Sequence, residues 1–505
     1  MPARTWNNSQ LALLIPQWFN TRLQSLHFLG SAVLTKAEAT LWLLAGILGF
    51  HAAYVTPAAG SWLLLTYLAL VQLTRLEPGR NSFLIGCLLG FSLVAPQLHF
   101  FFNIFSWAAI PLWIVLSFWF GLFLWLGCQL RRQFPAWAFV LTLPIVWLGI
   151  EYFRSELYYL RFSWLNAGFT MGLHLPSGLL QVFGVYGLGF MLMLLACLLS
   201  LLRREAMLVV TALAMLAFSA STRDWSLSSK LSKRIPIHSF AVAGVQLEFP
   251  TEGEVMRSLN EVLVKQPEAQ LIMLSEYAFA GPVPEKVREW CKVNQKYLVA
   301  GGKAPAANGD FYNTAFVIGP KGETVFEQVK QVPIQFFDDG LPAEKQALWE
   351  SPWGRLGICI CYDLSFSRVV DELVRQGAQG ILVPTMDVMH WGEYQHQLHA
   401  RVAPLRAMEH GVPIFRVASS GISQLVDSKG RVLASASMPG DGEILGGRMT
   451  VVTQGSQPID RHLAPAASAA TPLIGLLALI MRKRKSSSAV KNRESCSSIS
   501  PKSAL

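Results

Sequence analysis

Between residues 38 and 221 the chain is almost free of charged side chains, and this feature limits the folds open to it more than any other. The segment divides into apolar stretches that each approach the ~17–25 residues a helix needs to cross the hydrocarbon core of a membrane. We place seven stretches at about 39–56, 58–74, 82–102, 108–130, 134–153, 179–202 and 206–221. Pro57 alone separates the first two, which form either a tight pair of spans or one broken unit. Residues 38–221 are therefore predicted to be a multi-pass α-helical membrane domain.

An eighth apolar stretch at 463–481 precedes a run of four basic residues, 482–485. Residues 235–460, in contrast, carry charges throughout, although the whole chain is only 15% charged against about 25% for an ordinary soluble protein. The sequence thus predicts a seven-span membrane domain, a folded domain outside the membrane and a C-terminal transmembrane helix.

The distribution of Lys and Arg predicts the orientation, because basic loops stay in the cytoplasm. Basic residues cluster at Arg75 and Arg80, Arg131 and Arg132, Arg203 and Arg204, and 482–485. A cytoplasmic N-terminus places all four clusters on the cytoplasmic side. Seven spans then place 235–460 and the loop 154–178 on the side of the membrane opposite the cytoplasm.

The net charge of +10 does not indicate nucleic-acid binding, because the tail after Met481 holds seven Lys or Arg and one Glu. We expect the tail, 482–505, to be a basic, Ser-rich disordered segment in the cytoplasm. Residues 1–37 show no basic-then-apolar signal with a cleavage site, so we expect a cytoplasmic segment with an interfacial stretch around 11–28.

The region outside the membrane alternates short apolar runs with helical patterns. Strands are predicted at 238–247, 269–276, 296–302, 312–319, 355–361, 380–386, 412–419 and 423–434. Helices are predicted over 365–377, where a glycine provides the stop, and over about 393–409. This pattern predicts an α/β domain.

Three of the seven cysteines, Cys291, Cys359 and Cys361, fall in this domain, too few for a disulfide framework. A strand that ends at Cys361, followed by a helix near Ser365, would place that thiol by a helix N-terminus, which favours the thiolate. Cys359 lies two residues deeper in the same strand. A single strand cysteine is more often a packing residue, so the interpretation depends on other groups.

Two charged residues support a catalytic role for Cys361. Glu276 ends the apolar run 269–276, and Lys330 follows a run with strand-like alternation. A carboxylate can deprotonate a thiol, and an ammonium can stabilise charge on a carbonyl oxygen. Each alone would usually be a solvated surface charge; together they predict a Glu-Lys-Cys catalytic set.

Three stretches are the most distinctive for a family comparison: "GRLGICICYD" at 354–363, the run 394–433 and the dipeptide Val245-Gln246. With them, residues 235–460 resemble the carbon–nitrogen hydrolase (nitrilase) superfamily, and the whole chain resembles its apolipoprotein N-acyltransferase family. Residues 151–172 and 179–190 are similar to the membrane half of that family, which soluble nitrilases lack. The resemblance implies an α-β-β-α sandwich with Cys361 as the nucleophile.

The sequence departs from the family pattern around the lysine, in "VFEQVKQVPIQFFDDG" (325–340). Aligning on Pro333 would put Gln328 at the lysine position, whereas aligning on Lys330 keeps an acid, Asp338, eight residues later. We prefer the second register. After the nucleophile come Tyr362 and, in place of the family's Glu, Asp363, and we expect Asp338, Tyr362 and Asp363 to support the site. "SEYAF" at 275–279 is closer to soluble nitrilases, and the family's segment before the last span survives at best as 457–463.

The resemblance implies acyl transfer from a phosphatidylethanolamine-like phospholipid, through a cysteine thioester, to the α-amino group of a diacylglyceryl-modified apolipoprotein. It implies no cofactor. Aromatic residues of the 154–178 loop (Tyr158, Tyr159, Phe162 and Trp164) form either an interfacial lip for this site or an ordinary aromatic belt. The departures leave two alternatives open: a membrane-tethered amidase-like hydrolase, and a catalytically weak nitrilase-like binding protein.

Four residues, His390, Glu393, His396 and His399, are spaced so that some share one face of the predicted helix 393–409. They lack thiolates or carboxylates at zinc-ligand spacing, so we expect no metal site. No glycine-rich phosphate loop is present.

Overall fold

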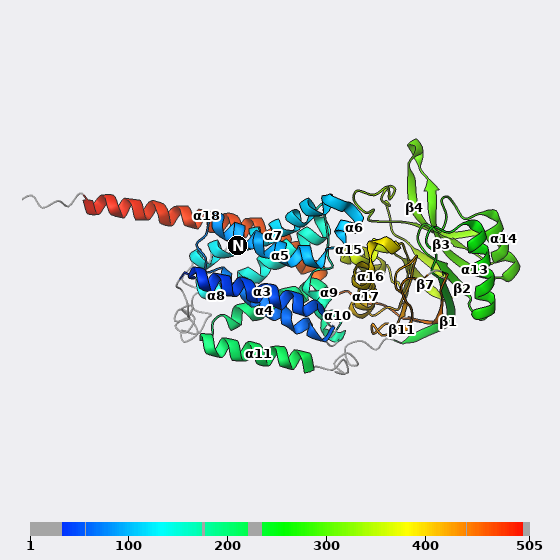
Figure 1. Cartoon of the computed structure of the whole chain (residues 1–505), viewed down its shortest axis with the longest axis horizontal. Helices are drawn as coiled ribbons and strands as arrows, with labels where there is room; N and C mark the ends of the chain where they lie inside the picture. Colours follow the sequence, from blue (N-terminus) through cyan, green and yellow to red (C-terminus); the bar gives the residue numbers. More distant parts are fainter. Residues whose placement is uncertain (1–32, 56, 174–176, 221–234, 441, 498–505) are drawn as a thin grey trace, which may run out of the picture.

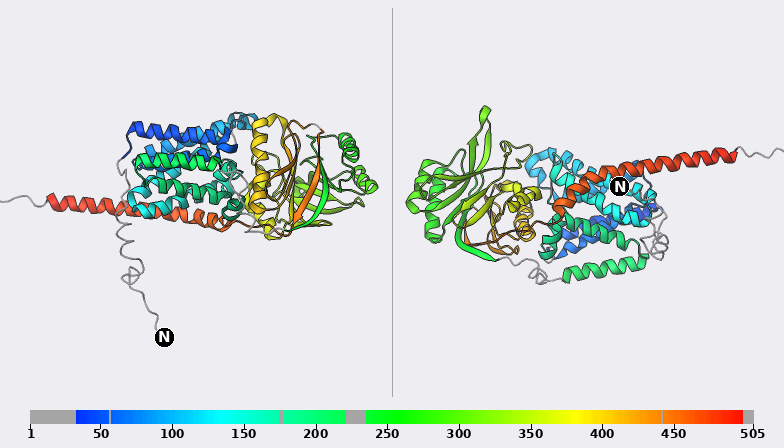
Figure 2. Two further views of the ribbon diagram at one scale, coloured as in Figure 1. Left: turned by 90° about the horizontal axis from the view of Figure 1, so that it is seen from below. Right: turned by 180° about the vertical axis from the view of Figure 1, so that it is seen from behind.

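The computed structural model describes residues 33–55, 57–173, 177–220, 235–440 and 442–497. A helix bundle and an α/β domain lie end to end along the long axis of the molecule (Figure 1). Helix α18 runs along the bundle and continues past it, away from the α/β domain, in all three views (Figure 2). Of the N-terminal segment predicted at 1–37, residues 1–32 lie outside the described residues.

Helices occupy all eight predicted apolar ranges. They are α3 (Lys36–Val55), α4 (Leu63–Leu73), α5 (Arg80–Gln97), α7 (Ala109–Gln133), α8 (Ala136–Tyr152), α10 (Ser177–Leu199), α11 (Arg204–Ala220) and α18 (Asp460–Ser497), with the short α6 (Phe101–Phe105) and α9 (Ala167–Met171) between them. In the described parts, five helical segments are long and apolar enough to cross a membrane: Lys36–Val55, Phe101–Gln133, Ala136–Leu157, Gly178–Leu199 and Asp460–Arg484. These five fit a membrane domain, and the total of eight spans stays a prediction.

The first two apolar stretches form two helices joined by a 3₁₀ segment, η2 (Pro57–Trp62). The two helices pack closely, because a Cβ on Gly46 of α3 would lie 3.1 Å from the Ala69 Cβ of α4. A tight helical pair thus describes this region better than one broken unit.

The prediction of disorder after Met481 is wrong for residues 482–497, which continue α18 as a helix. The span supplies an already formed helix, so each further residue adds a hydrogen bond without a new nucleation step. No Gly or Pro interrupts the sequence between 482 and 497, which removes the usual stop signals.

The α/β domain contains two six-stranded sheets. The first has the order β12-β1-β2-β3-β4-β5 and the second β11-β10-β9-β8-β7-β6. The strands are β1 (Pro236–Val245), β2 (Leu271–Leu274), β3 (Tyr297–Pro305), β4 (Phe311–Ile318), β5 (Thr324–Val329), β6 (Leu348–Ser351), β7 (Gly354–Ile358), β8 (Gly380–Thr385), β9 (Ile414–Ala418), β10 (Ser423–Val426), β11 (Val432–Ala436) and β12 (Ile444–Val452). Parallel pairs β1-β2, β2-β3, β7-β8 and β8-β9 form the centre of the two sheets, with antiparallel strands outside them.

The sheets face each other between two layers of helices, which confirms the predicted α-β-β-α sandwich. A Cβ on Gly244 of β1 would lie 2.4 Å from the Val417 side chain of β9. Helices α13 (Glu252–Lys265) and α14 (Glu285–Asn294) bury their apolar faces on the first sheet. Helices α15 (Ser367–Arg375), α16 (Glu393–Ala400) and α17 (Val402–His410) form the opposite layer, beside the bundle (Figure 1). The predicted helix 393–409 is thus two helices.

Buried carboxylates join the two parts of the molecule at a break in α10. Gly184 leaves the helical conformation (φ 73°), which frees the N–H groups that follow it. The N–H of Val185 donates to Glu409 Oε1 of α17 (2.8 Å), and the N–H of Tyr186 donates to Asp460 Oδ2 of α18 (2.9 Å). Because these groups are buried, each bond satisfies a donor that would otherwise be costly.

Candidate active site

Cys361 lies just beyond β7, on a sharp turn between that strand and α15. The predicted strand end at 361 is too late, since β7 ends at Ile358. Cys361 has φ 52°, an uncommon conformation for a residue with a side chain, and it opens the 3₁₀ turn η6 (Cys361–Ser365). The side chain is buried, and Sγ lies 3.5 Å from the backbone carbonyl of Met386. The turn therefore directs the thiol toward the end of β8, the neighbouring parallel strand.

Glu276 meets this thiol from the first sheet, directly beyond β2. Its Oε2 accepts a hydrogen bond from the Met386 N–H at 2.9 Å. The Met386 peptide thus contacts both Glu276 and Cys361. The other oxygen, Oε1, accepts from Asn313 Nδ2 (2.6 Å) and from Lys330 Nζ (2.9 Å).

Lys330 follows β5 and is fully buried between two carboxylates. Its Nζ lies 2.9 Å from Glu276 and 2.7 Å from Asp339 Oδ2. The expectation that Asp338 is the supporting acid is wrong: its side chain is 86% exposed and lies 3.9 Å from Lys303 Nζ. Phe336 has φ 70°, and the turn that it makes points the second of the two adjacent acids inward. The Asp339 carboxylate also accepts hydrogen bonds from the Tyr277 OH and from the Ile334 N–H.

The charges of this cluster act on one another in a nearly dry environment. Burial raises the pKa of the Cys361 thiol well above its ordinary value, and Glu276 raises it further. Burial also raises the pKa of Glu276, against the opposing effect of Lys330. Burial would lower the pKa of Lys330, but Asp339 and Glu276 outweigh it and raise that pKa well above its usual range. These directions describe a neutral thiol beside an ammonium, an arrangement in which a neighbouring carboxylate can accept the thiol proton.

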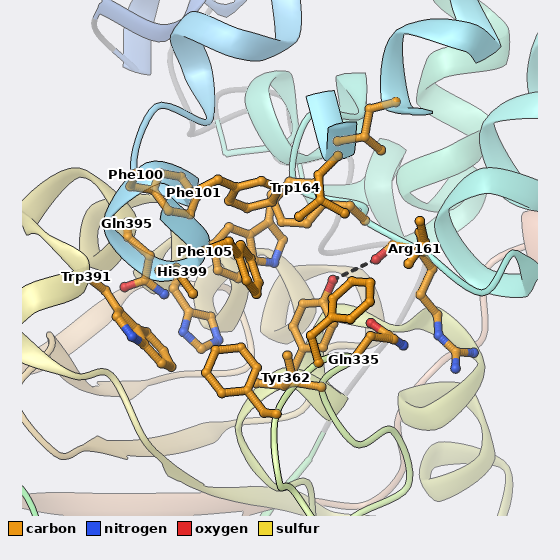
Figure 3. A pocket seen from close by; sticks show the side chains of 18 of the residues that line it. Phe100, Phe101, Phe105, Arg161, Trp164, Gln335, Tyr362, Trp391, Gln395 and His399 are labelled. Atoms are coloured by element: carbon orange, nitrogen blue, oxygen red, sulfur yellow. Dashed lines mark hydrogen bonds between the residues drawn. The ribbon is translucent and has the colours of Figure 1, made fainter. Parts of the chain in front are cut away.

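Hydrogen bonds to Asp363 connect the segment after Lys330 with the turn that contains Cys361. Its carboxylate accepts from the N–H groups of Gln331 (3.0 Å), Val332 (2.7 Å) and Ile360 (3.2 Å). Burial raises the pKa of Asp363 to about 6, although Lys330 and the three backbone donors oppose the rise. Tyr362 points the other way, and its OH donates to the backbone carbonyl of Arg161 in the 154–178 loop at 3.0 Å (Figure 3).

A pocket that is open to the outside leads from Cys361 to the helix bundle. Its walls come from α6 and α7, the 154–178 loop, the segment after Lys330, and the region of α16, as Figure 3 shows. The lining is mostly aromatic and aliphatic: Phe100, Phe101, Ile104, Phe105, Leu112, Leu116, Leu160, Phe162, Trp164, Ile334, Phe336, Phe337, Tyr362 and Trp391, with Arg161, Gln335, Gln395 and His399 as the main polar members. Of the four loop aromatics considered for an interfacial lip, Phe162 and Trp164 line this pocket.

The structure brings Glu276, Lys330 and Cys361 together with residues that the sequence analysis missed. Asn313 binds both Glu276 and Asp339, the latter at 2.8 Å. A signal for it was present, because Asn313 is a fully buried polar residue in the apolar strand β4. Met386 contributes only backbone groups, which no side-chain pattern reveals. Cys359 is fully buried and does not line the pocket.

Comparison with protein families divides the chain as the structure does. Residues 253–446 match the carbon–nitrogen hydrolase family, and residues 44–198 match the N-terminal domain of apolipoprotein N-acyltransferase. The first match includes the three residues of the charged cluster around Cys361. The second includes the membrane-side wall of the pocket.

Curated relatives match between about a third and three fifths of this chain. The apolipoprotein N-acyltransferase of Geobacter metallireducens is 22% identical over 343 residues, 58% of this chain and 65% of its own length. That of Azotobacter vinelandii is 27% identical over 350 residues, 60% of this chain and 66% of its own. Each match therefore spans just under two thirds of the relative. The deaminated glutathione amidase of Synechocystis is 29% identical over 222 residues, 35% of this chain and 79% of its own.

Among solved structures, the nitrilase-superfamily member Nit3 of Saccharomyces cerevisiae covers 43% of this chain and 93% of its own, at 19% identity and a TM-score of 0.37. The chain therefore combines a region similar to the N-terminal domain of apolipoprotein N-acyltransferase with a region similar to the carbon–nitrogen hydrolases.

Proposed function

We propose that this protein transfers a fatty acyl chain from a membrane phospholipid, through a thioester on Cys361, to the α-amino group of the N-terminal diacylglyceryl-cysteine of apolipoproteins. The main support is the position of Cys361, a buried thiol in the lining of an apolar pocket that the helix bundle helps to form. A hydrolase of small polar amides needs no such wall. A phospholipid acyl chain, in contrast, is stabilised by about 0.8 kcal/mol for each CH₂ that it buries there.

In the first half-reaction, Glu276 accepts the proton of the Cys361 thiol and the thiolate attacks the ester carbonyl carbon. Lys330 stabilises the negative charge on the carbonyl oxygen in the tetrahedral intermediate. The bond from carbon to the glycerol oxygen then breaks, and that oxygen takes the proton from Glu276. Lysophospholipid leaves, and the acyl group stays on Cys361 as a thioester.

In the second half-reaction, the amine of the acceptor attacks the thioester and the thiolate leaves, giving an amide. Both substrates are anchored in lipid, which explains a pocket that opens between the bundle and the α/β domain. We further propose that the enzyme lies in the bacterial inner membrane with its α/β domain on the periplasmic side, as the basic clusters predict.

The test is intact-mass analysis of the purified protein after incubation with phosphatidylethanolamine. Wild type is expected to gain one acyl mass that hydroxylamine removes, and Cys361→Ala is expected to gain none. Cys359→Ala is the matched control and keeps the gain, since Cys359 does not line the pocket. Wild type without any acyl mass would overturn the proposal and favour the amidase-like hydrolase.

A further inference from the structure

A second buried cluster borders the Cys361 pocket from the side of α16. His399 lines the pocket, and its Nδ1 lies 2.7 Å from Asp387 Oδ1. Arg416 Nη2 lies 2.5 Å from the other oxygen of Asp387. Arg416 Nη2 also approaches Nδ1, at 3.1 Å, but Asp387 Oδ1 is closer and can only accept. Nδ1 therefore carries the N–H, and Nε2 is the basic nitrogen of the neutral ring. Nothing in the acyl-transfer steps above uses this pair.

The His399 ring is held in a fixed orientation. It stacks on Trp164 of the 154–178 loop, with ring centroids 4.8 Å apart and planes 23° apart. Trp164 is fixed in turn, because its Nε1 donates to Ser365 Oγ at 2.9 Å. Figure 3 shows the His399 ring among the residues that line the pocket, near Tyr362 and Trp391. Within the described part of the chain, the buried Nε2 has no hydrogen-bond partner.

Asp387 connects the Asp387–His399 pair to Cys361 through the backbone. It follows Met386, whose N–H donates to Glu276 and whose carbonyl contacts Cys361 Sγ. The backbone of Asp387 is fixed by Ser419, which accepts from its N–H (3.0 Å) and donates to its carbonyl (2.9 Å). The Glu276–Cys361 pair and the Asp387–His399 pair are therefore built on two consecutive residues after β8.

The proposed second half-reaction releases two protons, and Glu276 accounts for one. An α-amino group has an ordinary pKa of about 7.7–8.0, so at neutral pH the acceptor arrives mainly as an ammonium without a lone pair. One proton must leave before attack, and another must leave as the amide forms. After the first half-reaction Glu276 is a single carboxylate with room for one proton.

We propose that His399 is a second catalytic base, which takes the first proton from the acceptor ammonium, with Asp387 as its positioning residue. This inference rests on the proposed function. The proton moves to Nε2, and Asp387 stabilises the imidazolium. The amine lone pair forms the C–N bond, the C–S bond breaks, and the second proton passes through Glu276 to the Cys361 thiolate. His399 then returns its proton to solvent.

The charges around His399 suit this role. Burial lowers the pKa of His399, with Asp387 opposing the effect and Arg416 and His396 adding to it, so the ring is neutral and able to accept a proton. Burial would raise the pKa of Asp387, but His399 and Arg416 reverse the effect and keep it ionised.

The test separates the two half-reactions in two variants: His399→Gln keeps a polar group beside Asp387, and His399→Phe keeps a ring against Trp164. The rate of discharge is measured on acyl-enzyme that has already formed, so an effect of either substitution on acylation does not enter it. Discharge onto the amine of a diacylglyceryl peptide at pH 7 is expected to fall by about 100-fold, the usual contribution of a positioned base. The loss should shrink as the pH rises past about 8, where the amine loses its proton unaided. Discharge onto hydroxylamine, which is neutral at pH 7, should match wild type.

The exposed His390, which does not line the pocket, provides the control, and His390→Gln is expected to behave as wild type in both steps. Equal losses with the peptide amine and hydroxylamine would overturn the role of His399, as would unchanged discharge onto the peptide in the folded variants. A wild-type protein that forms no acyl-enzyme would instead overturn the proposed function itself.

Discussion

Lys330 Nζ lies 2.7 Å from Asp339 Oδ2, while the preceding residue, Asp338, is exposed to solvent. Two adjacent acids of the same type thus make a matched pair for mutation. Asp339→Asn leaves Glu276 as the one carboxylate beside the lysine, which lowers the pKa of Glu276 and weakens it as a base. We expect thioester formation to slow by at least about 10-fold.

The same measurement on Asp338→Asn should give a rate within about twofold of wild type, because surface ion pairs contribute little. The acyl-enzyme is followed by intact mass over time with a phospholipid donor. Equal effects of the two substitutions would show that the lysine does not depend on Asp339.

Asp363 predicts a pH dependence of stability. Its native pKa of about 6 is above the ordinary value of about 3.9, so between these values the native state binds more protons than the unfolded state. Stability therefore falls as the pH rises through this window, by about 3 kcal/mol for a shift of two units. Asp363→Asn cannot titrate at this position. The free energy of unfolding of wild type, relative to that of the variant, should therefore fall between pH 4 and pH 7. Thermal unfolding midpoints of both proteins in detergent, measured across this pH range, check the prediction. A difference between the two midpoints that does not change with pH would contradict it.

The position of Phe105 in the pocket wall leads us to expect that Phe105→Ala weakens binding of the acyl donor. This α6 residue lines the pocket and packs edge-on against Phe336 and Phe337 of the segment after Lys330, with centroids 6.2 and 5.7 Å apart. Phe105→Ala removes one apolar wall from a bound acyl chain, and a loss of about 1.4 kcal/mol, less than the burial of two CH₂ groups, raises KM for phospholipid by about 10-fold. Phe102→Ala is the control, since Phe102 lies on the same helix outside the pocket. A change in kcat alone, or the same change in both variants, would contradict this role.

The placement of Glu276, Lys330 and Cys361 beyond strand ends could be predicted, because Glu276 ends an apolar strand pattern, Lys330 follows one, and Cys361 stands where a strand gives way to a helix. The membrane helices could be predicted from hydropathy, since backbone groups in lipid must pair within their own segment. The choice between Asp338 and Asp339 could not, because it depends on the positive φ of Phe336, a turn that no spacing rule describes.

Long-range contacts explain the other differences. Residues 177–199 show one unbroken apolar pattern, yet α10 breaks at Gly184 because carboxylates from Glu409 and Asp460, over 200 residues away, bind the freed N–H groups. Strand β6 is only four residues long, and β12 contains two glycines that weaken its strand pattern. Both strands are edge strands fixed by their neighbours.

Glu409 links the α/β domain to the bundle, and we expect its removal to lower the free energy of unfolding. Its carboxylate accepts from the Val185 N–H of α10 and pairs with Arg406, and all three groups are buried. Glu409→Ala removes the carboxylate that pairs with the buried guanidinium and leaves an N–H without its acceptor, which costs about 3–5 kcal/mol for a broken buried pair. Glu372→Ala breaks a partly exposed ion pair with Arg375 on α15 and should cost less than about 1 kcal/mol. Thermal unfolding in detergent compares the two, and similar small shifts would mean that water already satisfies the break in α10.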